Sequence, residues 1–156
     1  VVIVPEIEET IPEIIEDVEE VMPVKDEIAL VKKGVVIQEV TKLNLKYEFD
    51  KFVLTASDKK ELDNVLIAYM NQNPTSKVII ESHTDSRGGE VYNKYLSDQR
   101  MEQVVQYLEI KGISKDRVTA TGYGESKLKV KDTNDAGEYI ISYCKQNRRT
   151  EGFVVE

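Results

Sequence analysis

Apolar and polar side chains alternate along this chain in patterns that predict strands and helices in turn. Residues 78–80 form a short apolar run, as expected for a strand that is covered on both faces. Apolar positions alternate with polar ones over residues 43–49, which predicts a half-buried strand. Apolar side chains spaced three and four residues apart predict two helices. The first begins at Ser57, its expected N-cap, and ends before Pro74, and the second covers residues 96–108.

The remaining elements complete an α/β pattern. Apolar residues predict a first strand at residues 35–37, a short strand at residues 117–121, a helix at residues 136–145 and a last strand at residues 150–155. Strands and helices therefore follow one another as β-α-β-α-β, with a final helix and strand. This order predicts an α/β (α+β sandwich) fold in which helices pack on one mixed sheet.

Charge divides the chain into two parts. Residues 1–30 hold ten acidic residues and one lysine, a net charge of -9, whereas residues 31–156 carry +1 of the total of -8. The first segment also holds three of the four prolines and lacks glycine and aromatic residues. We therefore predict an acidic, partly helical linker over residues 1–30 and one folded domain over residues 31–156. The alternative is an amphipathic helix near residues 11–22 that docks on the domain or on a partner.

Composition excludes several classes of protein. A nearly neutral folded part offers no basic face for nucleic acid, so we expect no nucleic-acid partner. The lone Cys144 excludes an intramolecular disulfide. No apolar run approaches the roughly 20 residues of a membrane-spanning helix. The chain does not begin with methionine, so we expect that further sequence precedes Val1.

The second predicted helix carries a charge on its apolar stripe. Arg100 lies four residues after Leu96 and four before Val104, and therefore on the face that should be buried. A buried charge must be paired or bound to a ligand, because an isolated buried ion is too costly. Asp85, at the end of the preceding strand, is the nearest candidate. The two residues could receive a ligand that carries both an ammonium and a carboxylate; the alternative is a structural ion pair that joins loop and helix.

Several motifs in and after this region resemble those of a known family. The segment HTDSRG at residues 83–88 precedes YNKYLSDQR at residues 92–100, and GYGES at residues 122–126 precedes NRRTE at residues 147–151. Together and in this order, these motifs resemble the OmpA-like C-terminal domain, a module that holds peptidoglycan non-covalently. The resemblance covers roughly residues 33–155.

The resemblance implies an OmpA-like fold and a role for the charged pair. In the family, the matching aspartate and arginine bind the free end of diaminopimelate in the peptidoglycan stem peptide. Asp85 is therefore expected to bind the ammonium, and Arg100 the carboxylate with its planar fork. Three further positions that match the family's pocket lining are Asn93, Leu96 and Arg148. The loop that is expected to border the pocket contains Thr84, Ser86 and Arg87.

Catalysis and metal binding find little support in the sequence. His83 and Asp85 lie two apart on an extended segment, but catalytic zinc takes three protein ligands and the chain has no second histidine. We therefore expect a structural His83 that bonds a neighbouring loop, with no metal and no cofactor. Ser82 and Ser86 lie outside any Gly-x-Ser-x-Gly elbow, and Cys144 has no paired histidine, so we expect no enzyme.

These observations predict a non-catalytic module that binds peptidoglycan through diaminopimelate and anchors the outer membrane to the cell wall. By the same resemblance, we expect the domain on the periplasmic side of the outer membrane of a Gram-negative bacterium. A membrane-associated region is expected upstream, and a homodimer or a place in a flagellar motor stator is compatible with the family. The alternative function is a docking or dimerisation domain that keeps the fold without binding a ligand.

Overall fold

The computed structural model describes residues 42–155 of the 156-residue chain. The strand expected at residues 35–37 and the acidic linker expected at residues 1–30 lie outside the described residues. Within the described part of the chain, no helix is both long enough and apolar enough to cross a bilayer.

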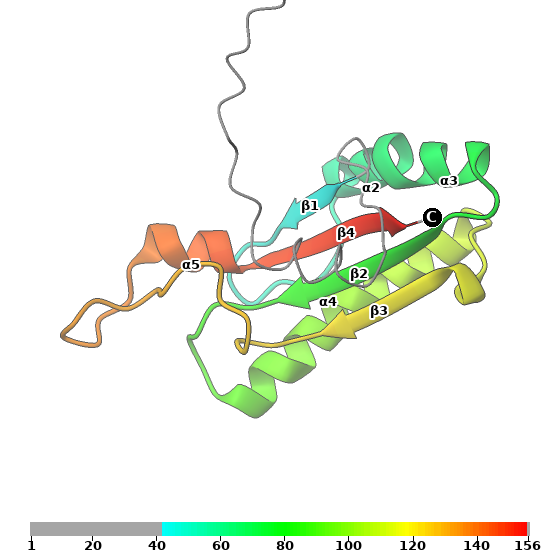
Figure 1. Cartoon of the computed structure of the whole chain (residues 1–156). Helices are drawn as coiled ribbons and strands as arrows, with labels where there is room; N and C mark the ends of the chain where they lie inside the picture. The colour runs from blue at the N-terminus through cyan, green and yellow to red at the C-terminus, as the bar shows by residue number, and fades with distance from the viewer. Residues whose placement is uncertain (1–41, 156) are drawn as a thin grey trace, which may run out of the picture.

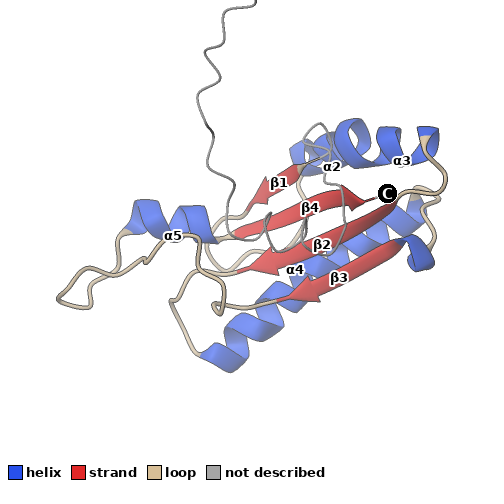
Figure 2. Cartoon of the chain, in the orientation of Figure 1, coloured by secondary structure: helices blue, strands red, loops and turns tan. Residues whose placement is uncertain are grey.

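Four strands form one mixed sheet, drawn as arrows in Figures 1 and 2. In chain order they are β1 (Leu43–Lys46), β2 (Lys77–His83), β3 (Val118–Gly122) and β4 (Arg149–Val155). Across the sheet the order is β1-β4-β2-β3, with β4 antiparallel to both of its neighbours and β2 parallel to β3. A parallel pair requires a crossover connection, which α4 (Glu90–Ile110) supplies, followed by the short 3₁₀ turn η3 (Lys115–Arg117).

Two helical segments cover one face of this sheet. A first helical segment consists of α2 (Ala56–Leu62), the π-helical turn η2 (Asp63–Ile67) and α3 (Ala68–Gln72). This segment and α4 lie behind the sheet in Figure 1. The residues buried between sheet and helices include Leu43, Leu45, Leu62, Leu66, Met70, Val78, Ile80, Val104 and Leu108. These are positions that the alternation and the helical spacing place on the buried faces, and the predicted α/β class, a mixed sheet with packed helices, is confirmed.

The first helix begins at a different cap from the predicted one. Thr55, not Ser57, is the N-cap: its hydroxyl accepts from the amide of Asp58 (3.2 Å), while its own amide donates to the Asp58 carboxylate (2.8 Å). This reciprocal arrangement requires an acid or amide three residues after the cap. Thr55 meets that requirement, whereas the residue three positions after Ser57 is Lys60.

The strand predicted over residues 43–49 is shorter than expected and ends at Lys46. The chain then turns at Asp50, which adopts a φ of +59°, a value incompatible with an extended strand. Tyr47 remains buried, but Phe49 is 54% exposed instead of facing the core. The turn therefore places an aromatic ring on the surface beside the loop that follows β2.

The last helix, α5 (Ile141–Asn147), begins five residues later than the prediction for residues 136–145. The side chain of Asn134 accepts hydrogen bonds from the amides of Ala136 (3.0 Å) and Glu138 (2.9 Å). Such side-chain contacts to the backbone compete with helix formation and favour a turn. The first half of the predicted helix is therefore a turn.

A testable prediction concerns the boundary proposed near residue 30. We expect that removal of residues 1–27 leaves the domain folded, because the change in charge and proline content there marks a linker. Limited proteolysis should yield a stable fragment that begins near Gly34, with the far-ultraviolet circular dichroism of a folded α/β domain. Loss of the cooperative unfolding transition on trimming to Leu30 would show that the segment belongs to the fold.

Candidate ligand-binding site

The predicted site residues gather at one end of the sheet. Strands β2 and β3 end there, β4 begins there, and the loop after β1 lies beside them (Figure 1). Residues 84–89 connect β2 to α4, and the amide of Thr84 donates to the carbonyl of Gly124 (2.9 Å) after β3. Gly88 has a φ of +94° in the turn that leads into α4, a conformation that residues with a side chain rarely adopt.

Arg100 is fully buried, as its place on the apolar stripe of α4 predicted. Its Nε donates to the carbonyl of Lys51 (2.8 Å) and its Nη1 to the carbonyl of His83 (2.7 Å). The guanidinium also lies 4.5 Å from the ring centroid of Tyr47. Its Nη2 has no hydrogen-bond partner among the described residues. Burial lowers the pKa of Arg100 to about 10, so the group remains charged at neutral pH.

The carboxylate of Asp85 is also buried, but its ion partners in the described part of the chain do not include Arg100. Its Oδ2 accepts from Nη2 of Arg87 (2.6 Å) and from Nη1 of Arg148 (3.0 Å). A structural ion pair between Asp85 and Arg100, the alternative from the sequence, is therefore wrong. The carbonyl groups of two other segments hold Arg100 instead, which leaves the two charges unpaired with each other.

Arg148 connects the end of β1 to the loop after β2. Its Nε donates to the carbonyl of Tyr47 (2.7 Å), and its Nη1 donates to Asp85. The amide of Tyr47 in turn donates to the carbonyl of Arg148 (3.2 Å), beside the pair that Lys46 and Arg149 form between β1 and β4. The register of these two strands thus brings a buried guanidinium, distant in sequence, to the site.

Arg87, which the sequence placed only at the border of the pocket, is a direct partner of Asp85. Its Nε (3.1 Å) and Nη2 (2.6 Å) both donate to Asp85 Oδ2, and its guanidinium lies 4.1 Å from the ring centroid of Phe49. The hydrogen bond to Asp85 raises the pKa of Arg87. The side chain is 20% exposed, so it can leave Asp85 toward solvent. Of the two cations on Asp85, Arg87 is therefore the more exposed.

Asn93 and Leu96 both lie on the buried stripe of α4, as predicted. The side-chain amide of Asn93 donates to the carbonyls of Asp85 (3.3 Å) and Arg87 (3.0 Å), and it also contacts the carboxylate of Glu125. Asn93 therefore ties the loop after β2 to α4. Glu125 belongs to the GYGES motif, whose contribution to the site was not identified from the sequence.

Ser86 is held by a residue that the sequence analysis missed. Its backbone amide (2.9 Å) and its hydroxyl (2.5 Å) donate to the two carboxylate oxygens of Asp132, and the side-chain amide of Asn147 also donates to Asp132 (3.0 Å). Although burial alone would raise the pKa of Asp132, the hydrogen bonds from Ser86 and Asn147 lower it. A lone aspartate in a polar loop gives no sequence signal for this role, because the contact spans 46 residues.

A cavity of about 60 Å³ lies among these side chains. It is lined by seven of the eight predicted residues, all except Ser86, together with Phe49, Asp50, Gly88 and Tyr92. The hydroxyl of Tyr92 donates to the carboxylate of Asp50 at its exposed edge. The cavity is thus smaller than a typical small-molecule site of roughly 300–1,000 Å³.

A larger cleft, of about 690 Å³, adjoins this cavity and shares Arg148 with it. It lies between the loop after β1 and the end of α5, and its lining includes Lys51 and Lys145 but neither Asp85 nor Arg100. Volume alone would favour the cleft, since small-molecule sites usually measure roughly 300–1,000 Å³. The chemistry favours the smaller cavity, because the buried charge with an unused donor lies there.

The contacts of Asp132 lead to a prediction that the sequence did not suggest. If the Ser86 loop must be held for binding, Asp132→Ala should weaken binding of the site's ligand by roughly fivefold, the equivalent of about one hydrogen bond. Retention on insoluble cell-wall material would measure the loss. Asp135→Ala is the matched control, since Asp135 is an exposed residue of the same loop region, paired only with Lys131 at 4.0 Å among the described ion pairs. Equal retention of the two variants would contradict a positioning role for Asp132.

The profile of the OmpA family matches residues 46–141, which is more than half of the chain. This chain belongs to the OmpA family. Among its OmpA-family relatives, outer membrane porin F of Pseudomonas fluorescens is 37% identical over 112 residues, which cover 72% of this chain and 32% of the porin. The peptidoglycan-associated lipoprotein of Buchnera aphidicola is 38% identical over 81 residues, or 52% of this chain and 46% of the lipoprotein.

A solved OmpA-family structure supports the fold. The crystal structure of the peptidoglycan-associated lipoprotein from Burkholderia pseudomallei superposes with a TM-score of 0.61 and 24% identity, and the match covers 72% of this chain and 89% of that one. The chain thus spans less than half the length of the two curated relatives, while it matches most of the solved domain. The resemblance identified from the HTDSRG and NRRTE motifs is confirmed.

Proposed function

We propose that this domain binds peptidoglycan non-covalently, through the free end of diaminopimelate in the stem peptide. The observation that carries the proposal is the buried Arg100, whose Nη2 lacks a hydrogen-bond partner among the described residues. The same cavity is lined by the carboxylate-bearing Asp85. A buried cation with an unused donor is costly unless a ligand accepts from it. An anionic oxygen of a ligand would satisfy this donor.

The two charges suit a zwitterion. The free end of diaminopimelate carries an ammonium and a carboxylate on one carbon atom. In the proposed complex Arg100 donates from Nη2 to the carboxylate, while its Nε and Nη1 remain fixed by backbone carbonyls. The ammonium replaces the guanidinium of Arg87 on Asp85, and Arg148 continues to hold that carboxylate in place. Binding thus exchanges one cation for another at Asp85, so the carboxylate never loses its compensation.

The relatives support this proposal by their names and by their place in the cell. One is a peptidoglycan-associated lipoprotein and another is an outer membrane porin. By similarity, we place this domain on the periplasmic side of a Gram-negative outer membrane, where it would anchor that membrane to the cell wall. Both relatives are longer than the matched region, so association of the whole protein with a membrane is part of the same proposal.

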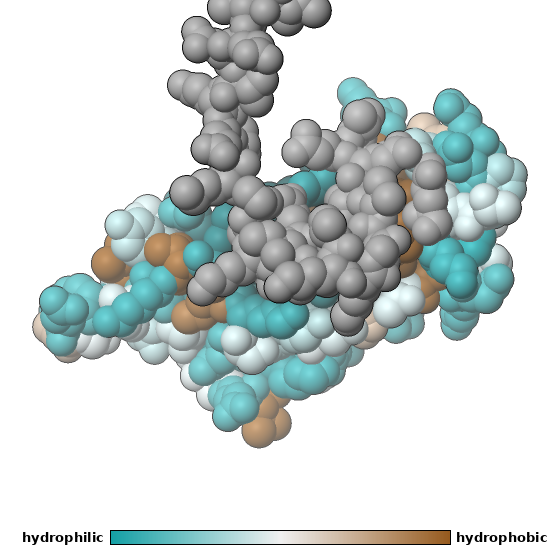
Figure 3. All heavy atoms as spheres, in the orientation of Figure 1, coloured by the Kyte–Doolittle hydropathy of each residue, from teal (hydrophilic) through white to brown (hydrophobic). Residues whose placement is uncertain are grey.

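A docking or dimerisation domain without a ligand is the alternative. Such a role usually requires a contiguous apolar surface. On the face shown in Figure 3, the described residues present a largely hydrophilic surface on which hydrophobic residues are scattered. The cavity at the end of the sheet offers the more specific chemistry, and we therefore favour ligand binding.

Retention on insoluble peptidoglycan tests the proposed function. The protein should sediment with diaminopimelate-containing peptidoglycan, and free diaminopimelate should compete for it. Peptidoglycan with lysine at the same position keeps the ammonium but lacks the second carboxylate, so it should retain little protein. The turbidity of the suspension should stay constant, since binding is proposed without hydrolysis. Equal retention on both types of peptidoglycan, or on neither, would overturn the proposal.

A further inference from the structure

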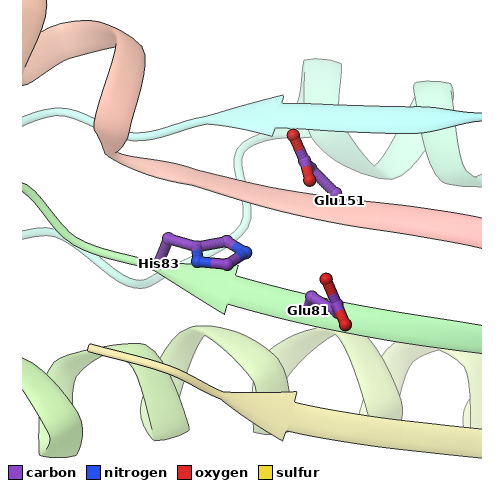
Figure 4. Close-up of side chains that lie close together, drawn as sticks. All are labelled: Glu81, His83 and Glu151. Atoms are coloured by element: carbon purple, nitrogen blue, oxygen red, sulfur yellow. The ribbon is translucent and has the colours of Figure 1, made fainter. Parts of the chain in front are cut away.

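A second cluster of polar side chains lies on the face of the sheet opposite the helices (Figure 4). Glu81 and His83 are two apart on β2 and therefore point to the same face. In the antiparallel register of β2 and β4, Glu81 is directly opposite Glu151. One carboxylate oxygen from each glutamate and one imidazole nitrogen of His83 all lie within 4.8 Å of one another. Three potential metal ligands thus meet on two adjacent strands.

Two features of this cluster suit a bound cation. Glu81 and Glu151 carry the same charge at directly paired positions, an arrangement that destabilises a sheet. Arg149 pairs with Glu151, whereas Glu81 accepts from the neutral hydroxyl of Tyr123. His83 is only 1% exposed, and neither Nδ1 nor Nε2 has a hydrogen-bond partner among the described residues. Buried polar atoms in proteins are almost always satisfied. In Figure 4 the imidazole extends toward the two carboxylates, so its unused nitrogen faces them.

We propose that Glu81, His83 and Glu151 bind a divalent transition-metal ion, for which zinc is the best match. One imidazole and two carboxylates supply three ligands, and a water molecule would complete a tetrahedral site. Calcium and magnesium prefer sites made only of oxygen atoms, whereas imidazole suits zinc and its neighbours. The ligand atoms of a tetrahedral zinc site are about 3.3 Å apart, so the glutamate side chains must close in from their present separation.

A neighbouring ring holds the imidazole of His83 in place. Metal coordination uses the neutral imidazole, in which one ring nitrogen has a free lone pair. The ring stacks on that of Tyr123, with centroids 5.4 Å apart, which fixes its plane.

The surrounding side chains can support the two carboxylates without blocking the ion. Arg149 donates from Nε to Glu151 Oε1 (3.0 Å), and the hydroxyl of Tyr123 donates to Glu81 Oε1 (3.3 Å). Each carboxylate has a second oxygen, so it can keep this donor and still coordinate an ion. Arg149 is the main competing cation. It also donates to the carbonyl of Asn147 (3.2 Å), so its position does not depend on Glu151 alone.

The metal proposal does not rest on the proposed peptidoglycan function, because Asp85 and Arg100 are not among the ligands. The two sites are neighbours, since the carbonyl of His83 accepts from Nη1 of Arg100 (2.7 Å). The sequence predicted no metal, since catalytic zinc takes three protein ligands and the chain has no second histidine. The two missing ligands come from the pairing of strands that are 70 residues apart, Glu81 opposite Glu151.

The single histidine makes the proposal directly testable. Tag-free protein, first treated with a chelator, would be titrated with zinc chloride while the imidazole nitrogens are followed by nitrogen-15 nuclear magnetic resonance. We expect saturation at one equivalent, with a large shift of one ring nitrogen of His83. Glu81→Gln and Glu151→Gln should each weaken zinc binding at least tenfold in calorimetry. Glu102→Gln is the matched control, since Glu102 is an exposed residue of α4 that bonds Gln106, and it should bind zinc like the wild type.

The outcomes separate this site from adventitious binding. Zinc binding that leaves the His83 resonances unchanged, or that survives unweakened in both glutamine variants, would overturn the proposal. Glutamine has the same shape as glutamate, and an unchanged circular dichroism spectrum would verify that both variants are folded. Peptidoglycan retention of the same samples is a separate readout, so failure of either proposal can be recognised without the other.

Discussion

Asp85→Ala and Arg100→Ala should each abolish retention on diaminopimelate-containing peptidoglycan. In the proposed complex each residue faces a complementary charge on the ligand, so its removal leaves the ligand's opposite group buried and unpaired. Truncation of one partner in such a pair typically costs roughly 2–5 kcal/mol, or more than tenfold in affinity. Calorimetric titration with a diaminopimelate-containing peptide would measure the loss, and sedimentation with insoluble peptidoglycan would provide a second readout.

Two further variants distinguish specific binding by Asp85 and Arg100 from a general effect of charge. Arg100→Lys should restore little binding, because a point charge cannot replace a planar fork that is already held by the carbonyls of Lys51 and His83. Arg87→Ala should not reduce affinity as Asp85→Ala does, because the ligand is proposed to displace Arg87 from Asp85 and the variant removes this competing cation. Wild-type affinity in both Asp85→Ala and Arg100→Ala, with folded circular dichroism spectra, would show that neither residue contacts the ligand and would favour the docking alternative.

The stability of the metal-free domain should fall steeply below pH 6.5, because of His83. The pKa of this residue is lowered from 6.5 to about 3 in the folded protein, chiefly by burial. Between these values the unfolded chain binds a proton that the folded chain does not, so folding becomes less favourable as the pH falls. Each pH unit costs about 1.4 kcal/mol, or roughly 2–3 kcal/mol between pH 6.5 and 4.5. Urea unfolding at several pH values, in the presence of a chelator, would measure this loss.

His83→Phe is the control for this pH dependence. The variant keeps an aromatic ring that can stack on Tyr123 and removes the titrating group. Carboxylates also titrate in this range, so the informative quantity is the difference between wild type and variant. Because His83 is the sole histidine, that difference can be assigned to it. Parallel pH profiles of unfolding free energy for the two proteins would contradict the buried, neutral state of His83.

The sequence by itself determined the elements and the burial of individual side chains. Helical spacing placed Asn93, Leu96 and Arg100 on the inner face of α4, and the structure confirms that all three are buried. Alternation likewise identified the inward positions of β1, and the apolar run of β2 contributes Val78 and Ile80 to the core. Such patterns are local, because a helix or strand repeats its own geometry every few residues. Errors arose where side chains bond to the backbone, as at Thr55 and Asn134.

The partners of the charged residues were decided only by the tertiary structure. The sequence suggested Arg100 as the partner of Asp85, but the carboxylate pairs with Arg87 and Arg148. Arg148 reaches it because β4 lies between β1 and β2, an order that the alternation of each strand does not specify.

The same reason explains the contacts that the sequence analysis did not foresee. Asp132 meets Ser86 across 46 residues, and Glu151 meets Glu81 through the register of two antiparallel strands. A strand's pattern indicates which face each side chain points to, but not which strand lies beside it or in which register. Elements and burial thus follow from the local sequence, whereas the chemistry of both proposed sites depends on which segments the fold brings together.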